Sequence, residues 1–249
     1  MSGHSKWSTI KHKKSAQDQR RGKVFGKLLR AIEVAAREGG ANIDGNPTLA
    51  SAVQKAKDYS VPNDNIERAI KRGSGEAGGA RYEEVVYEGY GPGGVAVFVH
   101  TLTDNRNRTG AEVRSTFTKR GGSLGDPGSV AFQFERTGVI RVSREEVREE
   151  DRLLELVLEA GAEDLAEEGD EWEIRTTPQA LAEVRQVLEG AGVPLVSAEI
   201  TMLPQTTVPV DGPEAKSVLA LIEALDDLDD VQSVYANFNI PDEILAQTG

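Results

Sequence analysis

A glycine-rich segment divides this chain into a part with helical periodicity and a part with strand periodicity. The segment is Gly73–Ala80, with the sequence GSGEAGGA, and its composition predicts a flexible linker. Before it, apolar residues recur every three or four positions, as they do on one face of an α-helix. From Arg81 onward they alternate with polar residues, as in half-buried strands. The pattern predicts a helical N-terminal domain, residues 1–76, followed by domains that contain β-sheet.

Three helices are predicted in the first part, each with one apolar face. Their predicted ranges are Gln19–Glu38, a segment from Pro47 with Asn46 as its N-cap, and a segment from about Asn63 to Gly73. Gly39 and Gly40 stop the first helix, as a left-handed C-cap does. Because each helix has a single apolar face, we expect a small bundle.

The second part predicts two α/β domains, one inserted in the other. Residues 138–203 contain a complete βαββαβ series, which is the ferredoxin-like order. The strand, helix and strand that follow are too few to bury two faces alone, so we expect them to complete the middle domain. The fold class is therefore α+β, with a discontinuous domain at 81–136 plus 204–240 and an inserted ferredoxin-like domain at 137–203. Two further expected elements are a strand over Val130–Glu135 and a helix over Arg144–Ala160.

The basic residues gather near the start of the chain, although the chain as a whole has a net charge of −12. The first thirty residues contain nine Lys or Arg and one acidic residue. A basic arm on an acidic body favours contact with a polyanion. The alternative is a lysine-rich terminus that stays in solvent without a partner.

Residues 3–14, GHSKWSTIKHKK, place an aromatic ring among lysines, imidazoles and hydroxyls. Lysines neutralise phosphates, hydroxyls and imidazoles bond to phosphate oxygens, and the Trp7 ring can stack on an unpaired base. Trp7 can equally well pack against the core of the bundle. The candidate nucleic-acid-binding residues are the basic, imidazole and indole side chains of this arm and of the helices after it, together with two arginines further along: His4, Lys6, Trp7, Lys11, His12, Lys13, Lys14, Arg20, Arg21, Lys23, Lys27, Arg30, Lys71, Arg72, Arg106 and Arg108.

The two distant arginines belong to the segment Asp104–Arg108, DNRNR. Asp104 is expected to cap the following helix while Arg106 and Arg108 project near its free backbone amides. A capped surface helix without an anion contact is the equal alternative. The acidic residues are expected to form solvated faces, including Asp226, Asp227, Asp229 and Asp230.

Several kinds of site find no support in the residues. The absence of cysteine excludes disulfides, thiolate catalysis and cysteine-ligated metals. Gly89–Gly94 matches G-x-G-x-x-G, but a strand follows it where a dinucleotide site needs a helix, so it predicts a hairpin turn. His4 and His12 lack the further ligands that a metal needs, and no apolar run approaches the roughly 20 residues of a membrane span. We expect a cytoplasmic, non-enzymatic protein with no cofactor, no metal, no small-molecule substrate and no membrane contact.

Five segments of the chain closely resemble the YebC family (YebC/PmpR-type regulatory proteins). They are Gly3–Lys14 (GHSKWSTIKHKK), Val61–Gly75 (VPNDNIERAIKRGSG), Tyr87–Val97 (YEGYGPGGVAV), Leu102–Thr109 (LTDNRNRT) and Gly128–Ile140 (GSVAFQFERTGVI). They cover most of residues 3–140. The eukaryotic relatives of the family are mitochondrial translational activators of cytochrome c oxidase subunit I. The resemblance implies a helical domain with two α/β domains, and a nucleic-acid-binding regulator. Some members are described as DNA-binding transcriptional regulators and others as ribosome-associated translation factors.

The residues themselves favour one of these two targets. Proteins that read DNA sequence usually place Arg, Asn or Gln side chains against base edges in the major groove. The basic helix here carries Lys and Arg, with only Gln17 and Gln19 at its start, which favours backbone contact and shape recognition, as on folded RNA. The first hypothesis is a translation factor that binds ribosomal RNA, and so the ribosome, through its basic domain. The alternative is a DNA-binding transcriptional regulator that uses the same residues. A nucleic-acid-processing enzyme and a protein-interaction scaffold rank below both.

Overall fold

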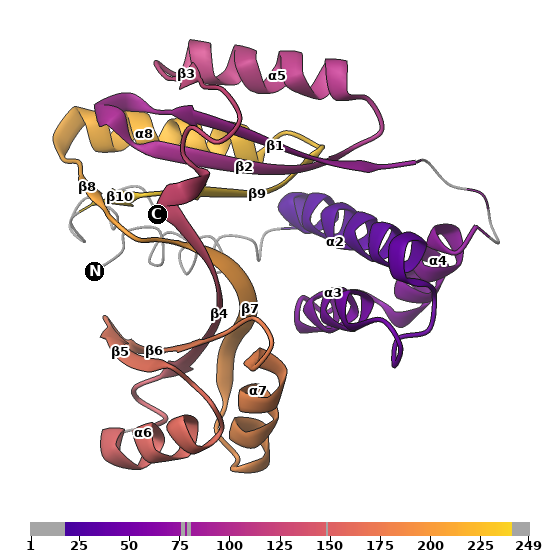
Figure 1. Ribbon diagram of the computed structural model, residues 1–249, viewed down its shortest axis with the longest axis vertical. Coiled ribbons are helices and arrows are strands. Elements are labelled where there is room, and N and C mark those ends of the chain that lie inside the picture. Colours follow the sequence, from indigo (N-terminus) through magenta and orange to yellow (C-terminus); the bar gives the residue numbers. More distant parts are fainter. Residues whose placement is uncertain (1–17, 76–77, 79–80, 148, 241–249) are drawn as a thin grey trace. The chain divides into compact units, whose positions relative to one another are not determined.

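The chain folds into two compact units, one inserted in the other (Figure 1). The computed structural model describes residues 18–75, 78, 81–147 and 149–240. The inserted unit is Phe134–Gln205, and the parts of the chain before and after it form the other unit. Helices and antiparallel sheets are both present, which confirms the predicted α+β class. The finer division into three domains stays a prediction, because the larger unit contains both a helical bundle and a sheet.

Within the described residues, the helical part is a bundle of three helices, with boundaries close to those predicted. They are α2 (Asp18–Gly39), α3 (Pro47–Asp58) and α4 (Asn63–Gly73). The predicted apolar stripe of α2 faces the other two helices, since Leu28, Ile32 and Ala36 are buried in the bundle core. Burial of these faces, rather than helix propensity alone, stabilises helices as short as α3 and α4.

The connection from α2 to α3 depends on one buried asparagine. Gly40 leaves the helix at φ = 88°, a left-handed conformation that glycine adopts without strain. The Asn46 side chain, 4% exposed, accepts the backbone N–H of Leu49 at 3.1 Å as the predicted N-cap. It also donates to the carbonyl oxygens of Ala35 and Gly40, each at 2.8 Å. The turn is therefore fixed at both ends by a single residue.

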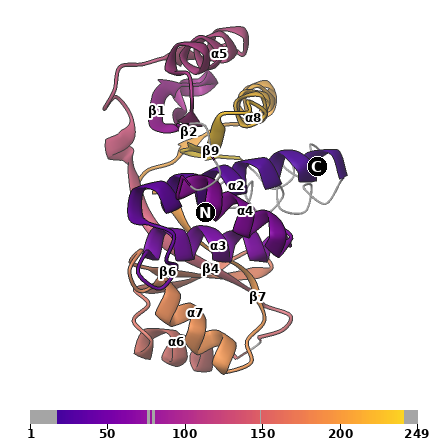
Figure 2. The same cartoon turned by 90° about the vertical axis from the view of Figure 1, so that its right-hand side faces the viewer.

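The other part of the larger unit is built on a four-stranded sheet. Its strands are β1 (Glu83–Tyr90), β2 (Ala96–Thr103), β3 (Ser123–Leu124) and β9 (Val231–Ala236), in the order β3-β1-β2-β9. Two helices, α5 (Arg106–Lys119) and α8 (Gly212–Asp226), lie side by side on one face of it (Figures 1 and 2). Between them and the sheet lies a core that includes Val99, Phe117 and Leu221, all fully buried.

Strand β9 joins the two ends of the larger unit. It pairs antiparallel with β2, so that Phe98 lies opposite Tyr235, although the inserted unit separates them in sequence. Two short strands after the insertion, β8 (Val208–Pro209) and β10 (Phe238–Asn239), pair in parallel beside it. The C-terminal elements thus complete the middle sheet, as the sequence predicts. The segment Gly89–Gly94 ends β1 and forms the predicted turn to β2, with a 3-10 turn at Pro92–Gly94.

The inserted unit has the predicted βαββαβ order. Its elements are β4 (Phe134–Ser143), α6 (Glu150–Glu159), β5 (Asp164–Glu168), β6 (Glu171–Thr176), α7 (Leu181–Gly190) and β7 (Leu195–Pro204). The strands form one antiparallel sheet in the order β5-β6-β4-β7, and α6 and α7 cover one face of it (Figure 1). Ile140, Ile174 and Val184 lie in the core between the sheet and the helices.

Two predicted elements were wrong in their extent. Residues 131–133 form a 3-10 turn, and one continuous strand starts at Phe134, where a strand over Val130–Glu135 was expected. The reason is the buried carboxylate of Glu88, which accepts the backbone N–H groups of Gly128, Val130 and Ala131 at 2.7–2.8 Å. Amides that point at a carboxylate cannot join a strand ladder. Burial of this carboxyl would raise its pKa, but the three backbone hydrogen bonds hold the pKa below its ordinary value.

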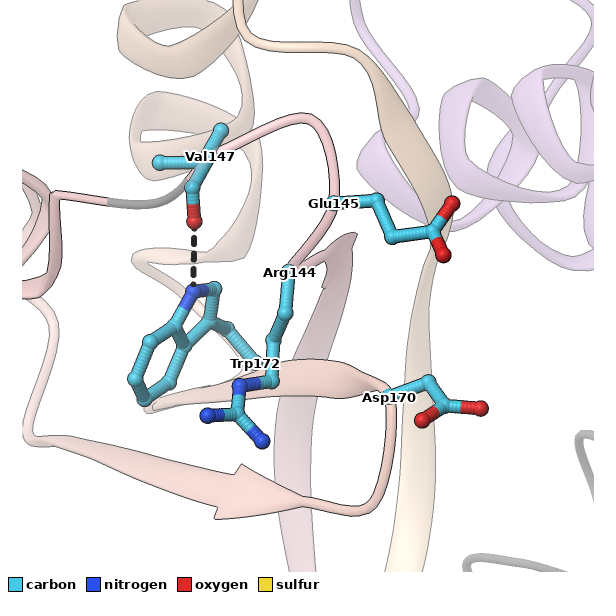
Figure 3. A pocket seen from close by; sticks show the side chains of 5 residues that line it. All are labelled: Arg144, Glu145, Val147, Asp170 and Trp172. Carbon is cyan, nitrogen blue, oxygen red and sulfur yellow. Dashed lines mark hydrogen bonds between the residues drawn. The ribbon is translucent and has the colours of Figure 1, made fainter.

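The helix expected over Arg144–Ala160 begins only at Glu150. Between them the indole N–H of Trp172 donates to the carbonyl oxygen of Val147 at 2.9 Å (Figure 3). The Arg144 guanidinium lies over the Trp172 ring, 5.0 Å from its centroid, and also donates to the carbonyl oxygen of Gly169 at 2.9 Å. These contacts to strand β6 and to the turn that precedes it hold the segment in a turn, so α6 starts later than its apolar periodicity indicates.

Candidate nucleic-acid interface

The structure describes fewer than half of the predicted binding residues in full. The arm residues His4, Lys6, Trp7, Lys11, His12, Lys13 and Lys14 lie outside the described residues. Arg20 and Arg21 lie on α2, where the structure gives the backbone only. The side chains that can be placed are those of Lys23, Lys27, Arg30, Lys71, Arg72, Arg106 and Arg108.

Three of these cations form a row along α2. Lys23, Lys27 and Arg30 are spaced four and three residues apart, so they share one face of the helix. This face contacts residues 226–230, which run from the last residue of α8 to the start of β9. We call this segment the acidic turn, because four of its five residues are aspartates. The basic row and the acidic turn both belong to the larger unit.

The two lysines bind the end of helix α8. Lys23 Nζ donates to the carbonyl oxygen of Asp227 at 3.1 Å. Lys27 Nζ donates to the carbonyl oxygen of Asp226 at 2.6 Å and lies 3.4 Å from its Oδ1. The last carbonyls of a helix have no partner within the helix and carry the negative end of its dipole, so they attract cations. The Lys27 side chain is only 15% exposed as a result.

Arg30 reaches further into the same turn. Its Nη1 donates to the carbonyl oxygens of Asp229 at 2.9 Å and Leu102 at 3.0 Å, and to Oδ1 of Asp230 at 3.0 Å. Its guanidinium also lies 4.8 Å from the centre of the Tyr82 ring, a cation–π distance. The expectation that the four aspartates form a solvated face was wrong for Asp226 and Asp230, because these two carboxylates pair with Lys27 and Arg30.

Asp230 is the centre of a buried polar network. Its side chain is 4% exposed. Oδ2 accepts hydrogen bonds from Arg108 at 2.6 Å, from Thr109 at 2.6 Å and from Thr103 at 3.1 Å. Burial would raise the pKa of this carboxyl, but the hydrogen bonds and the positive charge of Arg108 lower it below its ordinary value. Asp230 therefore stays ionised and ties α5, β2 and α2 together.

The same network changes the interpretation of the DNRNR segment. Asn105 caps α5, accepting the backbone N–H of Arg108 at 3.1 Å, where Asp104 was the expected cap. Asp104 instead accepts a hydrogen bond from the Arg108 guanidinium at 2.8 Å. The hydrogen bonds of Arg108 to Asp230 and to Asp104 raise the pKa of its guanidinium, which is engaged in contacts within the protein. Arg106 is 65% exposed and lies 3.8 Å from Glu83, so it remains accessible to an anion.

The two cations at the end of α4, Lys71 and Arg72, have different surroundings. Lys71 is exposed. Arg72 donates through Nε to Oε1 of Glu33 at 2.6 Å, and Glu33 is 8% exposed on α2. Arg72 thus joins α4 to α2, and Lys71 is the accessible cation of the pair.

The inserted unit contains a separate cavity of about 310 Å³. Figure 3 shows its lining residues, Arg144, Glu145, Val147, Asp170 and Trp172. The Arg144 guanidinium covers the indole face and forms an ion pair with Glu167. Arg144, the cation of this lining, and the Trp172 ring are therefore engaged in holding the turn before α6.

Taken together, the described site binds oxygen acceptors through a row of cations on α2. Within the described ranges no group of three or more His, Asp or Glu side chains is arranged to hold a metal ion. No helix among the residues that the structure describes is long and apolar enough to cross a membrane. The role of the acidic turn was not predicted from the sequence. A signal was present, because the run DDLDD begins at the last residue of the apolar helix Gly212–Asp226 and directly precedes the strand Val231–Ala236.

The chain matches two family models in succession. Residues 5–76 match the TACO1/YebC protein N-terminal domain, and residues 82–238 match the TACO1/YebC second and third domain. A relative from Acidothermus cellulolyticus, named "Probable transcriptional regulatory protein", is 56% identical over 99% of this chain and 100% of its own length. One with the same name from Dictyoglomus thermophilum is 54% identical over 98% of each chain. The crystal structure of a conserved hypothetical protein from Aquifex aeolicus has a TM-score of 0.81 and 52% identity, covering 92% of this chain and 94% of that one. Because both models and full-length relatives match, the chain belongs to the TACO1/YebC family.

Proposed function

We propose that this protein is a non-enzymatic regulator of gene expression that binds a nucleic acid through its basic helical part. The observation that carries the proposal is the row Lys23, Lys27 and Arg30, whose donors already hold carbonyl and carboxylate oxygens at 2.6–3.1 Å. Phosphate oxygens are acceptors of the same kind, and most protein contacts to nucleic acid go to them. The sequence adds the basic arm before α2.

The target that we favour is folded ribosomal RNA, which would make the protein a translation factor at the ribosome. The basic residues are Lys and Arg, which bind phosphates and can recognise the shape of a folded RNA. Few Asn or Gln side chains, which would contact base edges, accompany them on α2. The acidic remainder of the chain would resist lying along a phosphate surface, so binding is confined to the arm and the bundle. The family resemblance to mitochondrial translational activators supports the same target.

A second candidate is a DNA-binding transcriptional regulator in the cytoplasm that uses the same residues. The names of the two relatives at 56% and 54% identity favour it. Phosphate contacts by Lys and Arg serve both kinds of nucleic acid, so this distinction rests on the target recovered from cells.

Crosslinking in cells separates the two candidates. We would irradiate cells with ultraviolet light, purify the protein under denaturing conditions, and sequence RNA and DNA from the same sample while mapping the crosslinked peptides. Ribosomal RNA attached to residues 1–40 is the expected result. Promoter DNA at those residues, with ribosomal RNA at background, would instead establish the transcriptional candidate.

Binding by the purified chain tests the basic arm itself. Reversing Lys11, Lys13 and Lys14 to Glu should remove most of the affinity and flatten its dependence on salt, because fewer counterions are released. The matched control reverses three exposed cations outside the candidate site, Arg136, Arg152 and Lys216, with the same change in net charge. Equal affinities for the two triple variants would show that only overall charge matters and would remove the arm from the mechanism.

A further inference from the structure

We propose that the acidic turn is an internal competitor of the nucleic acid for the basic row on α2. While α2 is docked on the turn, the donors of Lys27 and Arg30 face aspartates and helix carbonyls. A polyanion that uses this row must displace the turn. The inference rests on the proposed function, and it adds a regulatory contact to it.

The first support is that the acidic turn covers the side chains of Lys27 and Arg30. The side chains of Lys27 and Arg30 are 15% and 19% exposed, so little of either faces solvent. Arg30 Nη1 alone lies within 3.0 Å of three oxygens. Arg30 Nη1 cannot donate to a phosphate while it donates to these oxygens. At both residues the turn therefore occupies donors and covers surface that a nucleic acid would use.

The second support is the chemistry of the occupant. The acidic turn presents four aspartates within five residues, next to the carbonyl end of α8. Carboxylate oxygens, helix carbonyls at the negative end of a dipole and phosphate oxygens are all hydrogen-bond acceptors that cations stabilise. The turn thus supplies the kind of ligand that the row is proposed to bind.

The third support is that α2 can separate from the acidic turn without exposing the hydrophobic core of the bundle or that of the sheet. The hydrophobic cluster of the bundle and that of the sheet with α5 and α8 share no residue. The contacts described between the basic row and the turn are hydrogen bonds and ion pairs, with the Arg30–Tyr82 contact beside them. Asp230 remains held by Arg108, Thr103 and Thr109 when α2 leaves, so the turn keeps its place on the sheet.

Competition of this kind lowers the apparent affinity. If only a fraction of molecules has α2 released, the observed dissociation constant is the intrinsic one divided by that fraction. Locking the contact closed should therefore weaken binding, and releasing it should restore binding in the same molecule.

Because the chain has no cysteine, two introduced cysteines can be crosslinked specifically to test the competition. We would introduce Gly26→Cys on α2 and Asp227→Cys in the acidic turn, and join them with a reductant-cleavable bismaleimide. Gly26 is exposed, lies on the same face as the basic row, and a Cβ added there has no atom within 4 Å. Asp227 accepts Lys23 through its backbone carbonyl, which the substitution keeps. The probes are a fluorescent DNA duplex and a fluorescent RNA hairpin, each measured at fixed salt.

The locked protein should bind its preferred probe about tenfold more weakly than the same sample after cleavage of the linker. The Gly26→Cys variant, treated with the same reagents, should bind equally before and after reduction. Equal affinities of the locked and the cleaved protein, with binding intact in both, would overturn the competition and leave the proposed function standing. Failure of the two cysteines to crosslink would overturn the docked contact. Failure of the cleaved protein to bind either probe would overturn the proposed function, and this inference with it.

Discussion

Replacing Asp230 with Asn should destabilise the larger unit strongly. The substitution keeps the shape of the side chain but removes its charge, and puts an amide donor near Arg108, Thr109 or Arg30 where an acceptor is required. Removing one partner of a buried ion pair costs about 3–5 kcal/mol. Since Arg108 is 45% exposed and can be solvated in part, we expect about 3 kcal/mol. For a chain of this length that corresponds to a fall in Tm of roughly 6–12 °C.

The matched control for this variant is Asp229→Asn. Asp229 is exposed and contributes its backbone carbonyl to Arg30, so the same change of charge should alter stability by less than about 0.5 kcal/mol. Urea and thermal unfolding followed by circular dichroism measure both variants. Equal Tm values for Asp230→Asn and Asp229→Asn would refute the assigned role of the network.

The pH dependence of the free energy of unfolding provides a second test of the role of Asp230. The pKa of Asp230 is lowered in the folded state, so its contribution is complete above the unfolded pKa of about 3.9 and is lost as the pH falls through the folded value. The stability difference between the wild type and Asp230→Asn should therefore be constant from about pH 5 to 8 and shrink below about pH 4. A difference that grows on acidification would contradict the assignment.

The remaining predictions concern two other close contacts. Gly73→Ala should destabilise the bundle by about 1–3 kcal/mol, because a Cβ there would lie 2.4 Å from the carbonyl oxygen of Glu33; Gly26→Ala, with open space around it, should be neutral or stabilising, and the two urea midpoints decide the comparison. Glu88→Gln should cost about 1–3 kcal/mol, since an amide donor replaces one of two oxygens that accept three backbone N–H groups. Hydrogen exchange at Gly128, Val130 and Ala131 should accelerate in this variant, and unchanged protection there would refute the role of the carboxylate.

Local periodicity and capping predicted most of the fold. The ends of α2, α3 and α4 follow from glycines, an N-cap and apolar stripes, all of which act over a few residues. The errors arose where a distant side chain overrides the local pattern. Glu88 draws three amides out of an expected strand, and the contacts of Trp172 and Arg144 delay the start of α6.

The positions of the described cations on α2 were predictable from the sequence, whereas the groups that they contact were not. Basic residues were correctly placed along one helix, since their spacing determines the face that they share. Their partners could not be identified, because the acidic turn lies about two hundred positions away in the sequence. Charge patterns show which residues can attract an anion, whereas tertiary structure decides whether an aspartate of the same chain already occupies them.

The insertion has a consequence for the order of folding. Strand β2 finds its partner β9 only across the whole inserted unit, and such a distant pairing is slow because a long loop must close first. The inserted unit begins and ends on paired strands, with Phe134 opposite Pro204. Once it has folded, it brings its two ends together and the loop between β2 and β9 becomes effectively short. We therefore expect the inserted unit to fold early and to accelerate the closure of the sheet that surrounds it in sequence.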